Sequence, residues 1–375
     1  MVSRLRGFSL VELLVSITIG LFVLAAVVTV LVNSKQNYTV QDSLARLQEN
    51  ARFAVDFITR DLRMSGHFGC AHLPLGTANN QLNVLASPLL EANGGLAGVD
   101  DIVVGASTWQ PSGAPTAQPG GTIQFVPGSD VVLVRYMNGV GVPLTASMTA
   151  VTAPVTIAAG NGLNQGDNVI VADCNTADVF RITSANPDTT GVLGHAPGVA
   201  DNTSDALSKP YELDQNPVVT SFMIARYFIA TNTARPGRLG LYRQVGAAAP
   251  QELVEGIENM QVLYGVDTDP RPPPPQVPNY SPNVYVTAEN VGCLVLDGSG
   301  ACIGWDRVTS LRIGLLAYTL ASESYDDSGE YGRLEDAGTY DVNGKILRTA
   351  DGNLDAKRVK RRVFTTTIAL RNLRP

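Results

Sequence analysis

Two kinds of helix-breaking residue are missing from a long stretch near the start of the chain. The first proline is Pro74, and no glycine occurs between Gly20 and Gly66. Proline removes a helical hydrogen bond, and glycine weakens a helix by about 1 kcal/mol relative to alanine. Their absence excludes an early break and allows one uninterrupted helix across this stretch.

Charged residues are also scarce. They make up 16% of the 375 residues, whereas 45% are hydrophobic. This balance excludes an intrinsically disordered chain and suits a folded core together with a membrane segment. The formal net charge of −7 argues against a general attraction to nucleic acid.

Sequence motifs of several enzyme classes are missing as well. The chain has no G-x-S-x-G, H-E-x-x-H or Walker A motif, and it has only three histidines. His195 lies in a stretch rich in glycine, proline and alanine and has no evident catalytic partner. We therefore expect that the protein is not an enzyme and needs no cofactor.

The chain contains four cysteines, which are Cys70, Cys174, Cys293 and Cys302. A low, even number behind an N-terminal membrane segment favours disulfides in an oxidising compartment. The turn dipeptide Asp297-Gly298 favours a disulfide-closed hairpin between the last two cysteines, which would leave the first two to pair. Four cysteines allow three pairings, and the sequence does not choose among them.

The longest apolar run stands at the N-terminus. Residues 1–7 carry Arg4 and Arg6, and residues 8–32 carry a single charge, Glu12. As a helix, residues 8–32 would be about 37 Å long, enough to cross a hydrocarbon core of about 30 Å. The run is too long for a cleaved secretory signal, whose apolar core has about 7 to 15 residues. It predicts a single-pass anchor with a cytoplasmic N-terminus, because basic residues stay on the cytoplasmic side.

Glu12 is an anomaly in this run, because a carboxylate at the centre of a membrane helix costs about 2.5 to 3.5 kcal/mol. The stretch GFSLVELL, residues 7–14, resembles the type IV prepilin signal. In that family a dedicated peptidase cuts after the glycine, the new N-terminal residue is N-methylated, and a glutamate stands fifth after the cut. The resemblance implies cleavage between Gly7 and Phe8, methylation of the Phe8 amine and an assembly role for Glu12.

The new amine at Phe8 would offset the cost of Glu12, because an amine and a carboxylate are less costly in lipid as a pair than apart. The pair would form within one subunit or between stacked neighbours. The alternative is that Glu12 lies near enough to the cytoplasmic end to reach the membrane surface by itself.

Beyond the apolar run the sequence becomes amphipathic. Apolar residues recur at helical spacing, at Val40, Leu44, Leu47, Ala51, Ala54, Ile58 and Leu62. Polar residues mark the opposite face, at Gln41, Arg46, Glu49, Arg52, Arg60 and Arg63. The pattern predicts one helix from Phe8 to about Met64, about 85 Å long, with a membrane half (8–32) and an amphipathic half (33–66).

Four further stretches resemble the PilW family, which are minor pilins of the type IV pilus. They are Arg46–Cys70, Val254–Asp267, Val308–Ala317 and Arg361–Asn372. The resemblance implies a minor pilin that primes pilus assembly at or near the tip. Its partners would be other minor pilins, the major pilin, the prepilin peptidase, the inner-membrane assembly platform and a tip adhesin. It would be anchored in the inner membrane with its globular part in the periplasm, and later lie at the pilus tip.

The remainder, residues 67–375, is expected to form a β-rich periplasmic domain. Predicted strands are Asp101–Val104, Thr122–Val126, Ser129–Met137, Asp167–Asp173, Asp178–Ala185, Val218–Thr231, Leu239–Val245, Asn259–Asp267, Ser310–Ala321 and Val363–Asn372. A long helix followed by many strands predicts an α+β, type IV pilin-like fold, with the helix packed on an antiparallel sheet. Residues 74–215 match no motif and are expected to be a variable, loop- and strand-rich insertion.

Other candidate sites are weaker. Asp351, Asn353 and Asp355 resemble the start of a calcium loop, but Arg362 stands where its bidentate glutamate should be. Residues 326–330 form a similar acidic turn, and both stretches are equally typical of solvated turns. His67, Cys70 and His72 would lack a fourth protein ligand for zinc, so we expect no metal.

A basic run stands before the last predicted strand, with Lys357, Arg358, Lys360, Arg361 and Arg362 as candidate contacts to nucleic acid. It contains no aromatic residue to stack on a base, and a solvated strand end or an acidic neighbouring subunit explains it as well. The proline-rich residues 267–282 are interpreted as a stiff surface loop, and the alternative is a polyproline segment that binds a partner. The alternatives to a pilus protein are a type II secretion pseudopilin, a DNA-binding minor pilin for DNA uptake and an anchored periplasmic enzyme.

Overall fold

The computed structural model describes residues 9–68, 79–80, 95–102, 123–197, 202–232, 234, 238–246, 248–269, 279–291, 305–320, 339–348 and 360–372. Its helices and strands are α1 (Leu10–Met64), β1 (Asn79–Asn80), β2 (Leu96–Val99), β3 (Ile123–Phe125), β4 (Val131–Pro143), β5 (Val155–Thr156), β6 (Asn168–Ala172), β7 (Ala177–Arg181), α3 (Pro187–Thr190), β8 (Val192–Leu193), the 3₁₀ turn η1 (Leu213–Gln215), β9 (Val218–Asn232), β10 (Leu239–Val245), β11 (Gln251–Glu255), β12 (Ile257–Val266), β13 (Val284–Val286), α4 (Ala288–Val291), η2 (Trp305–Arg307), β14 (Val308–Tyr318), β15 (Thr339–Val342), β16 (Lys345–Arg348) and β17 (Arg361–Ala369).

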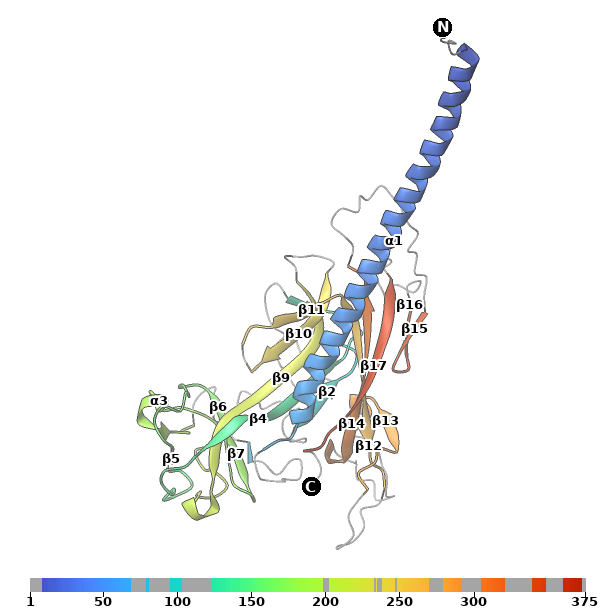
Figure 1. Ribbon diagram of the computed structural model, residues 1–375. Coiled ribbons are helices and arrows are strands. Elements are labelled where there is room, and N and C mark those ends of the chain that lie inside the picture. Colours follow the sequence, from blue (N-terminus) through green and yellow to red (C-terminus); the bar gives the residue numbers. More distant parts are fainter. Residues whose placement is uncertain are drawn as a thin grey trace.

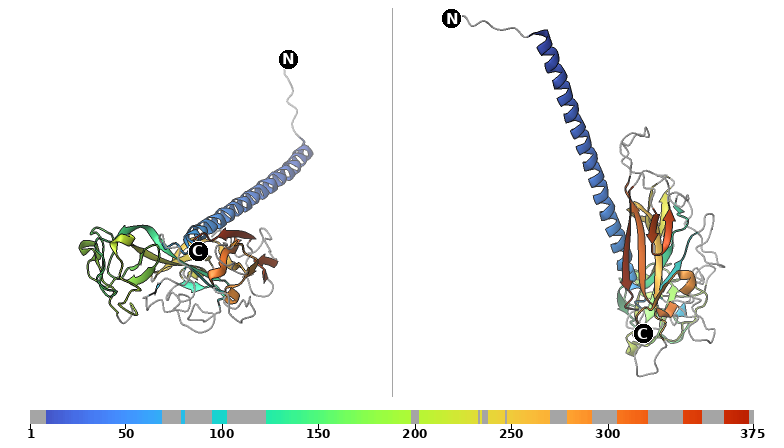
Figure 2. Two further views of the ribbon diagram at one scale, coloured as in Figure 1. Left: turned by 90° about the horizontal axis from the view of Figure 1, so that it is seen from below. Right: turned by 90° about the vertical axis from the view of Figure 1, so that its right-hand side faces the viewer.

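The predicted long helix is confirmed as α1, a single helix of 55 residues. At 1.5 Å per residue it is about 82 Å long. It ends where Gly66 adopts a positive φ of 74°, a conformation that glycine enters without a steric cost. Its N-terminal half projects away from the rest of the molecule, and its C-terminal half lies against the strands (Figure 1, Figure 2).

Most strands belong to two sheets. The larger has nine strands, in the order β1-β7-β6-β9-β10-β11, with β3 and β4 also paired with β9 and β2 paired with β4. The smaller has the order β13-β12-β14-β17. Their strand pairs are antiparallel except for β1 with β7. The fold is α+β as predicted, but the expected single main sheet is replaced by two.

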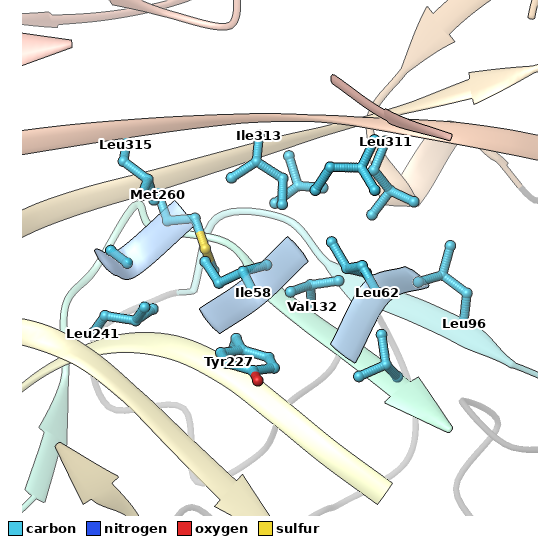
Figure 3. Packing of buried hydrophobic residues seen from close by; sticks show 14 of the residues in the cluster. Ile58, Leu62, Leu96, Val132, Tyr227, Leu241, Met260, Leu311, Ile313 and Leu315 are labelled. Atoms are coloured by element: carbon cyan, nitrogen blue, oxygen red, sulfur yellow. The ribbon is translucent and has the colours of Figure 1, made fainter. Parts of the chain in front are cut away.

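The C-terminal half of α1 packs between these two sheets. Its buried side chains are Leu47, Ala51, Ala54, Ile58 and Leu62. Figure 3 shows Ile58 with Tyr227 and Leu241 of the larger sheet on one side and Met260 and Ile313 of the smaller sheet on the other. Each large buried aliphatic side chain contributes about 1.5 to 3 kcal/mol, so this face holds helix and sheets together.

The helical periodicity therefore predicted the buried face well. Val40 and Leu44, at the start of the predicted face, are only half-buried because the strands begin to cover the helix beyond them. All six residues predicted to form the polar face are exposed.

The two sheets also meet directly, at the turn that leads into β4. Ser129 Oγ accepts a hydrogen bond from the Met260 N–H (3.1 Å), and the Asp130 N–H donates to the Met260 carbonyl (2.9 Å). Asp130 Oδ2 accepts from the Val262 N–H (2.7 Å), and its Oδ1 accepts from the Asp101 N–H (3.0 Å). β13 pairs with β12 only at residues 264–266, so it does not reach the backbone groups of Met260 and Val262. The turn at Ser129 and Asp130 supplies hydrogen-bond partners for these groups.

An insertion separates β4 from β9. The two strands are antiparallel neighbours, with Pro143 opposite Val218, and the chain between these ends, described at residues 144–197 and 202–217, forms a lobe. This lobe has its own buried cluster, which includes Leu163, Phe180 and Tyr211. Figure 1 shows it at the end of the molecule away from the N-terminus. The lobe covers much of the stretch, residues 74–215, for which the sequence offered no motif.

Most predicted strands are confirmed, with small differences at their ends. The predictions from Thr122–Val126 onward correspond to β3, β4, β6, β7, β9, β10, β12, β14 and β17. The prediction for Asp101–Val104 is wrong at its described residues, because the strand there is β2 and Asp101 adopts a φ of 44° just after it. Sequence reasoning missed the short strands β1, β5, β8, β11, β13, β15 and β16.

The buried face of α1 can be tested by truncating one side chain. We expect Ile58→Ala, at a fully buried position, to lower the free energy of unfolding by about 2 to 5 kcal/mol through a cavity between helix and sheets. The matched control is Phe57→Ala, which removes a larger side chain that is 45% exposed and should cost less than about 1 kcal/mol. Denaturant unfolding of the detergent-solubilised chain measures both. Equal losses would contradict the buried-face assignment.

The Asp130 junction predicts a pH dependence. Burial raises the pKa of Asp130 to about 7, against an unfolded value of about 3.9. The folded state therefore holds a proton that the unfolded state releases, so this group stabilises the fold at low pH, and that stabilisation is lost as the pH rises from about 4 through about 7. We expect the denaturation midpoint of the wild type to fall more steeply over this range than that of Asp130→Asn. Parallel pH profiles would contradict the assignment.

Candidate assembly site

The start of α1 is closed by a capping box. Ser9 is the N-cap residue, and its Oγ accepts a hydrogen bond from the Glu12 N–H (3.2 Å). In return, Glu12 Oε2 accepts a hydrogen bond from the Ser9 N–H (3.1 Å). Two backbone donors that have no partner within a helix are thus satisfied at its first turn. The sequence shows this motif as S-x-x-E, but our reading of the sequence did not use it.

The capping box fixes where the Glu12 carboxylate lies. It is bound to the backbone N–H of the residue that directly follows Phe8. Consecutive Cα atoms are about 3.8 Å apart, so an amine created at Phe8 would start within one residue of this carboxylate. Gly7 and Phe8 themselves lie outside the described residues.

The first half of α1 offers an apolar surface on all sides. Every residue from 9 to 35 is exposed, and Phe22 has 79% of its surface accessible. Within the described part of the chain, α1 is long and apolar enough to cross a membrane, with a mean hydropathy of 2.7 over 18 residues. Glu12 lies inside this surface, so the helix carries its carboxylate into an environment that favours a partner.

The other end of α1 is fixed by a buried polar cluster. Asp61 Oδ2 accepts hydrogen bonds from the Tyr227 hydroxyl (2.6 Å) on β9 and from Arg243 Nε (2.9 Å) on β10. Arg243 Nη2 also donates to the Tyr136 hydroxyl (3.3 Å) on β4. Burial, together with the Asp61 carboxylate, raises the pKa of Tyr227 well above its ordinary value, so the phenol stays a donor. A shift of one residue along the helix would leave this carboxylate without its partners.

One of the four disulfide candidates, Cys174, lies among the described residues. Cys174 is disulfide-bonded, and it lies in the turn between β6 and β7. Cys70, Cys293 and Cys302 lie outside the described residues.

Neighbouring residues favour one partner for Cys174. Phe68 packs in a buried cluster with Ala172 and Ala177, which flank the turn that holds Cys174. Phe68 stands two residues before Cys70, so we propose Cys70 as the partner of Cys174. This bond would join the end of α1 to the lobe.

The described residues of the basic run differ in their burial, and one of them is engaged within the domain. The Arg361 guanidinium is buried and donates to both carboxylate oxygens of Glu258, from Nε to Oε2 (2.5 Å) and from Nη2 to Oε1 (3.0 Å). It is therefore engaged within the domain and does not face a nucleic acid. Lys360 is half-buried and Arg362 is exposed, while Lys357 and Arg358 lie outside the described residues.

The calcium candidates Asp351, Asn353 and Asp355 also lie outside the described residues, as do the acidic turn at 326–330 and most of the proline-rich segment. His67 is described, but Cys70 and His72 are not. Within the part of the chain that the structure describes, no group of three His, Cys, Asp or Glu side chains could hold a metal ion.

Comparisons with known proteins match both ends of the chain. The family model PilW, type IV pilus-assembly protein W, matches residues 226–372. The model of the prokaryotic N-terminal methylation motif matches residues 3–28. The first match covers β10 to β17 with the C-terminal part of β9, and the second covers the capping box and much of the apolar half of α1. No curated protein and no solved structure gives a significant match.

The proposed Cys70–Cys174 bond is open to a direct test. We expect a non-reducing protease digest, analysed by mass spectrometry, to contain one peptide pair that joins these two cysteines and disappears on reduction. A pair that joins Cys174 to Cys293 or Cys302 would contradict the proposal.

Proposed function

Because the chain belongs to the PilW family of type IV pilus-assembly proteins, we propose that it is a minor pilin that primes pilus assembly at or near the tip. Its leader, residues 1–7, would be removed by the prepilin peptidase, and Phe8 would become the N-methylated N-terminus. The chain would first be held in the inner membrane with its globular part in the periplasm. It would then join other minor pilins on the assembly platform, followed by the major pilin.

One observation carries this proposal. The methylation motif lies on a helix that is fully exposed and apolar in its first half and wedged between two sheets in its second half. Such a helix can be held by lipid or by neighbouring helices at one end while a rigid domain is fixed to the other. A plain membrane anchor needs neither the motif nor a carboxylate at Glu12.

The capping box supports a specific role for Glu12. Before cleavage, its carboxylate is occupied by the Ser9 N–H. After cleavage, the adjacent Phe8 amine supplies a positive charge within reach of the same carboxylate. Pairing would remove much of the cost of burying both groups, and it is available within the chain or with the next subunit. Cleavage would thereby convert Glu12 from a helix cap into one half of an ion pair.

Processing is tested by mass spectrometry of the protein extracted from membranes. We expect the N-terminal peptide to begin with N-methyl-Phe8. A chain that retains Met1 in cells with an active prepilin peptidase would contradict the proposed function. Loss of protein secretion with normal pili in a deletion strain would instead support a type II secretion pseudopilin.

The role of Glu12 is tested by separating its charge from its capping role. We expect Glu12→Ala and Glu12→Gln to be cleaved normally but to enter sheared pili at least about tenfold less than wild type, since both lose the ion pair. Glutamine still caps a helix from this position, so a wild-type level of Glu12→Gln in pili would contradict the ion-pair argument.

Ser9→Ala is the matched control for this pair. It removes the hydroxyl that accepts from the Glu12 N–H but keeps the Glu12 charge. We expect its incorporation to stay close to wild type. Immunoblots of sheared pili against the membrane fraction measure all three variants.

A further inference from the structure

An exposed apolar stripe runs along the second half of α1. Phe53, Phe57 and Met64 expose 48%, 45% and 36% of their surfaces. They are separated by four and seven residues, so they lie on one side of the helix. This side is distinct from the buried face, to which Ala54, Ile58 and Leu62 belong.

Lipid cannot cover this stripe once residues 8–32 span the membrane. Phe53 lies 21 residues beyond Val32, which is about 31 Å along the helix. The hydrocarbon core is about 30 Å thick and is already spanned by the apolar half. Exposed phenylalanines in water are typical of protein interfaces, where aromatic residues, methionine and arginine are enriched.

The spacing of the stripe fits a helical partner. With Arg60 included, the positions 53, 57, 60 and 64 alternate by four, three and four residues. This alternation is the seam along which two helices pack in a coiled coil. The aliphatic stem of Arg60 can cover apolar surface while its guanidinium reaches toward the partner.

The end of the stripe is basic. Arg60 and Arg63 are exposed, and the bond from Asn372 Nδ2 to the Arg63 carbonyl (2.9 Å) brings the exposed Arg371 next to them. Residues 53–64 contain two acidic residues: Asp61 is buried and engaged by Arg243, and Asp56 is exposed one turn before Arg60, so the arginines still outnumber the exposed carboxylate at this end. The charge here is thus opposite to the formal net charge of −7 of the whole chain.

This charge argues against a second copy as the partner. Two copies anchored in the same bilayer would lie parallel and level, and Arg60 of one would face Arg60 of the other across the seam. Like charges at facing positions are unfavourable and disfavour that pairing.

We propose that residues 53–64 form a docking stripe for a different membrane-anchored subunit. Its parallel amphipathic helix would present an apolar seam with carboxylates level with Arg60 and Arg63. This rests on the proposed function, because the common membrane orientation makes the two helices parallel. The charge would make the contact selective, favouring an acidic helix over self-association.

Photo-crosslinking of the full chain in membranes of the piliated host tests this proposal. A photoreactive phenylalanine analogue, benzoylphenylalanine, replaces Phe57, and crosslinked peptides are identified by mass spectrometry. We expect a peptide from the amphipathic helix half of another pilin-type subunit, with acidic residues beside the crosslink. A crosslink to a second copy of this chain, to a peptide without carboxylates, or to no protein would overturn the proposal.

The control site for the crosslinker is Gln48. It is exposed and lies nine residues before Phe57, half a turn around the helix. We expect at least fivefold less of the same crosslinked peptide from this position. Equal yields from both positions would overturn the assignment of the stripe.

Charge reversal tests the selectivity. Arg60→Glu combined with Arg63→Glu should lower the Phe57-site crosslink at least fivefold, whereas Gln48→Glu, half a turn around the helix from Phe57, should leave it unchanged. An unchanged yield in the double variant would overturn the charge argument. The Cys174 disulfide in each variant reports folding, and N-methyl-Phe8 in the same samples reports processing. Chains that are folded and processed but give no crosslink contradict the docking stripe alone, whereas chains without N-methyl-Phe8 contradict the proposed function.

Discussion

The packing of one helix face between two β-sheets is the contact on which the other features depend. Residues 47–62 of α1 complete a core to which both sheets contribute. Ala51 and Ala54 keep the helix narrow at the point where strands close on it, and Ile58 and Leu62 fill the space beyond. Because this half is fixed in a domain, the apolar half has no contact with the strands and projects from them (Figure 2).

Two carboxylates define the two ends of this helix. Asp61 is buried in the domain, and its partners Tyr227 and Arg243 come from strands that fold against it. Glu12 lies in the apolar half, where among the described residues its carboxylate accepts a hydrogen bond from the backbone N–H of Ser9. One carboxylate therefore fixes the helix within its own subunit, and under the proposed function the other pairs with the amine that cleavage would create beside it.

The helix and its buried face could be predicted because their signal is local. The absence of proline and glycine, together with the helical spacing from Leu47 to Leu62, needs no knowledge of distant residues. The long strands were found for the same reason, since β-branched runs such as β9 stand out by composition. The division into two sheets was missed, because it depends on pairing order and leaves no local pattern.

The contacts that fix the site were harder to predict. The Asp61–Tyr227 bond joins residues 166 positions apart, and the Asp130–Val262 bond joins residues 132 positions apart. Before the fold is known, each of these aspartates looks like an ordinary surface charge. Within the lobe the sequence predicted the strands β6 and β7, but it gave no sign that the segment between β4 and β9 has a folded core of its own.

Hydrogen exchange of the full chain in detergent tests the central role of α1 most directly. If the helix completes the core, the backbone amides of residues 47–62 should be as strongly protected as those of β9, β12 and β14, and all should lose protection together in mild denaturant. Residues 36–44, which are mostly exposed, should exchange earlier. Rapid exchange in residues 47–62 while both sheets stay protected would contradict the account.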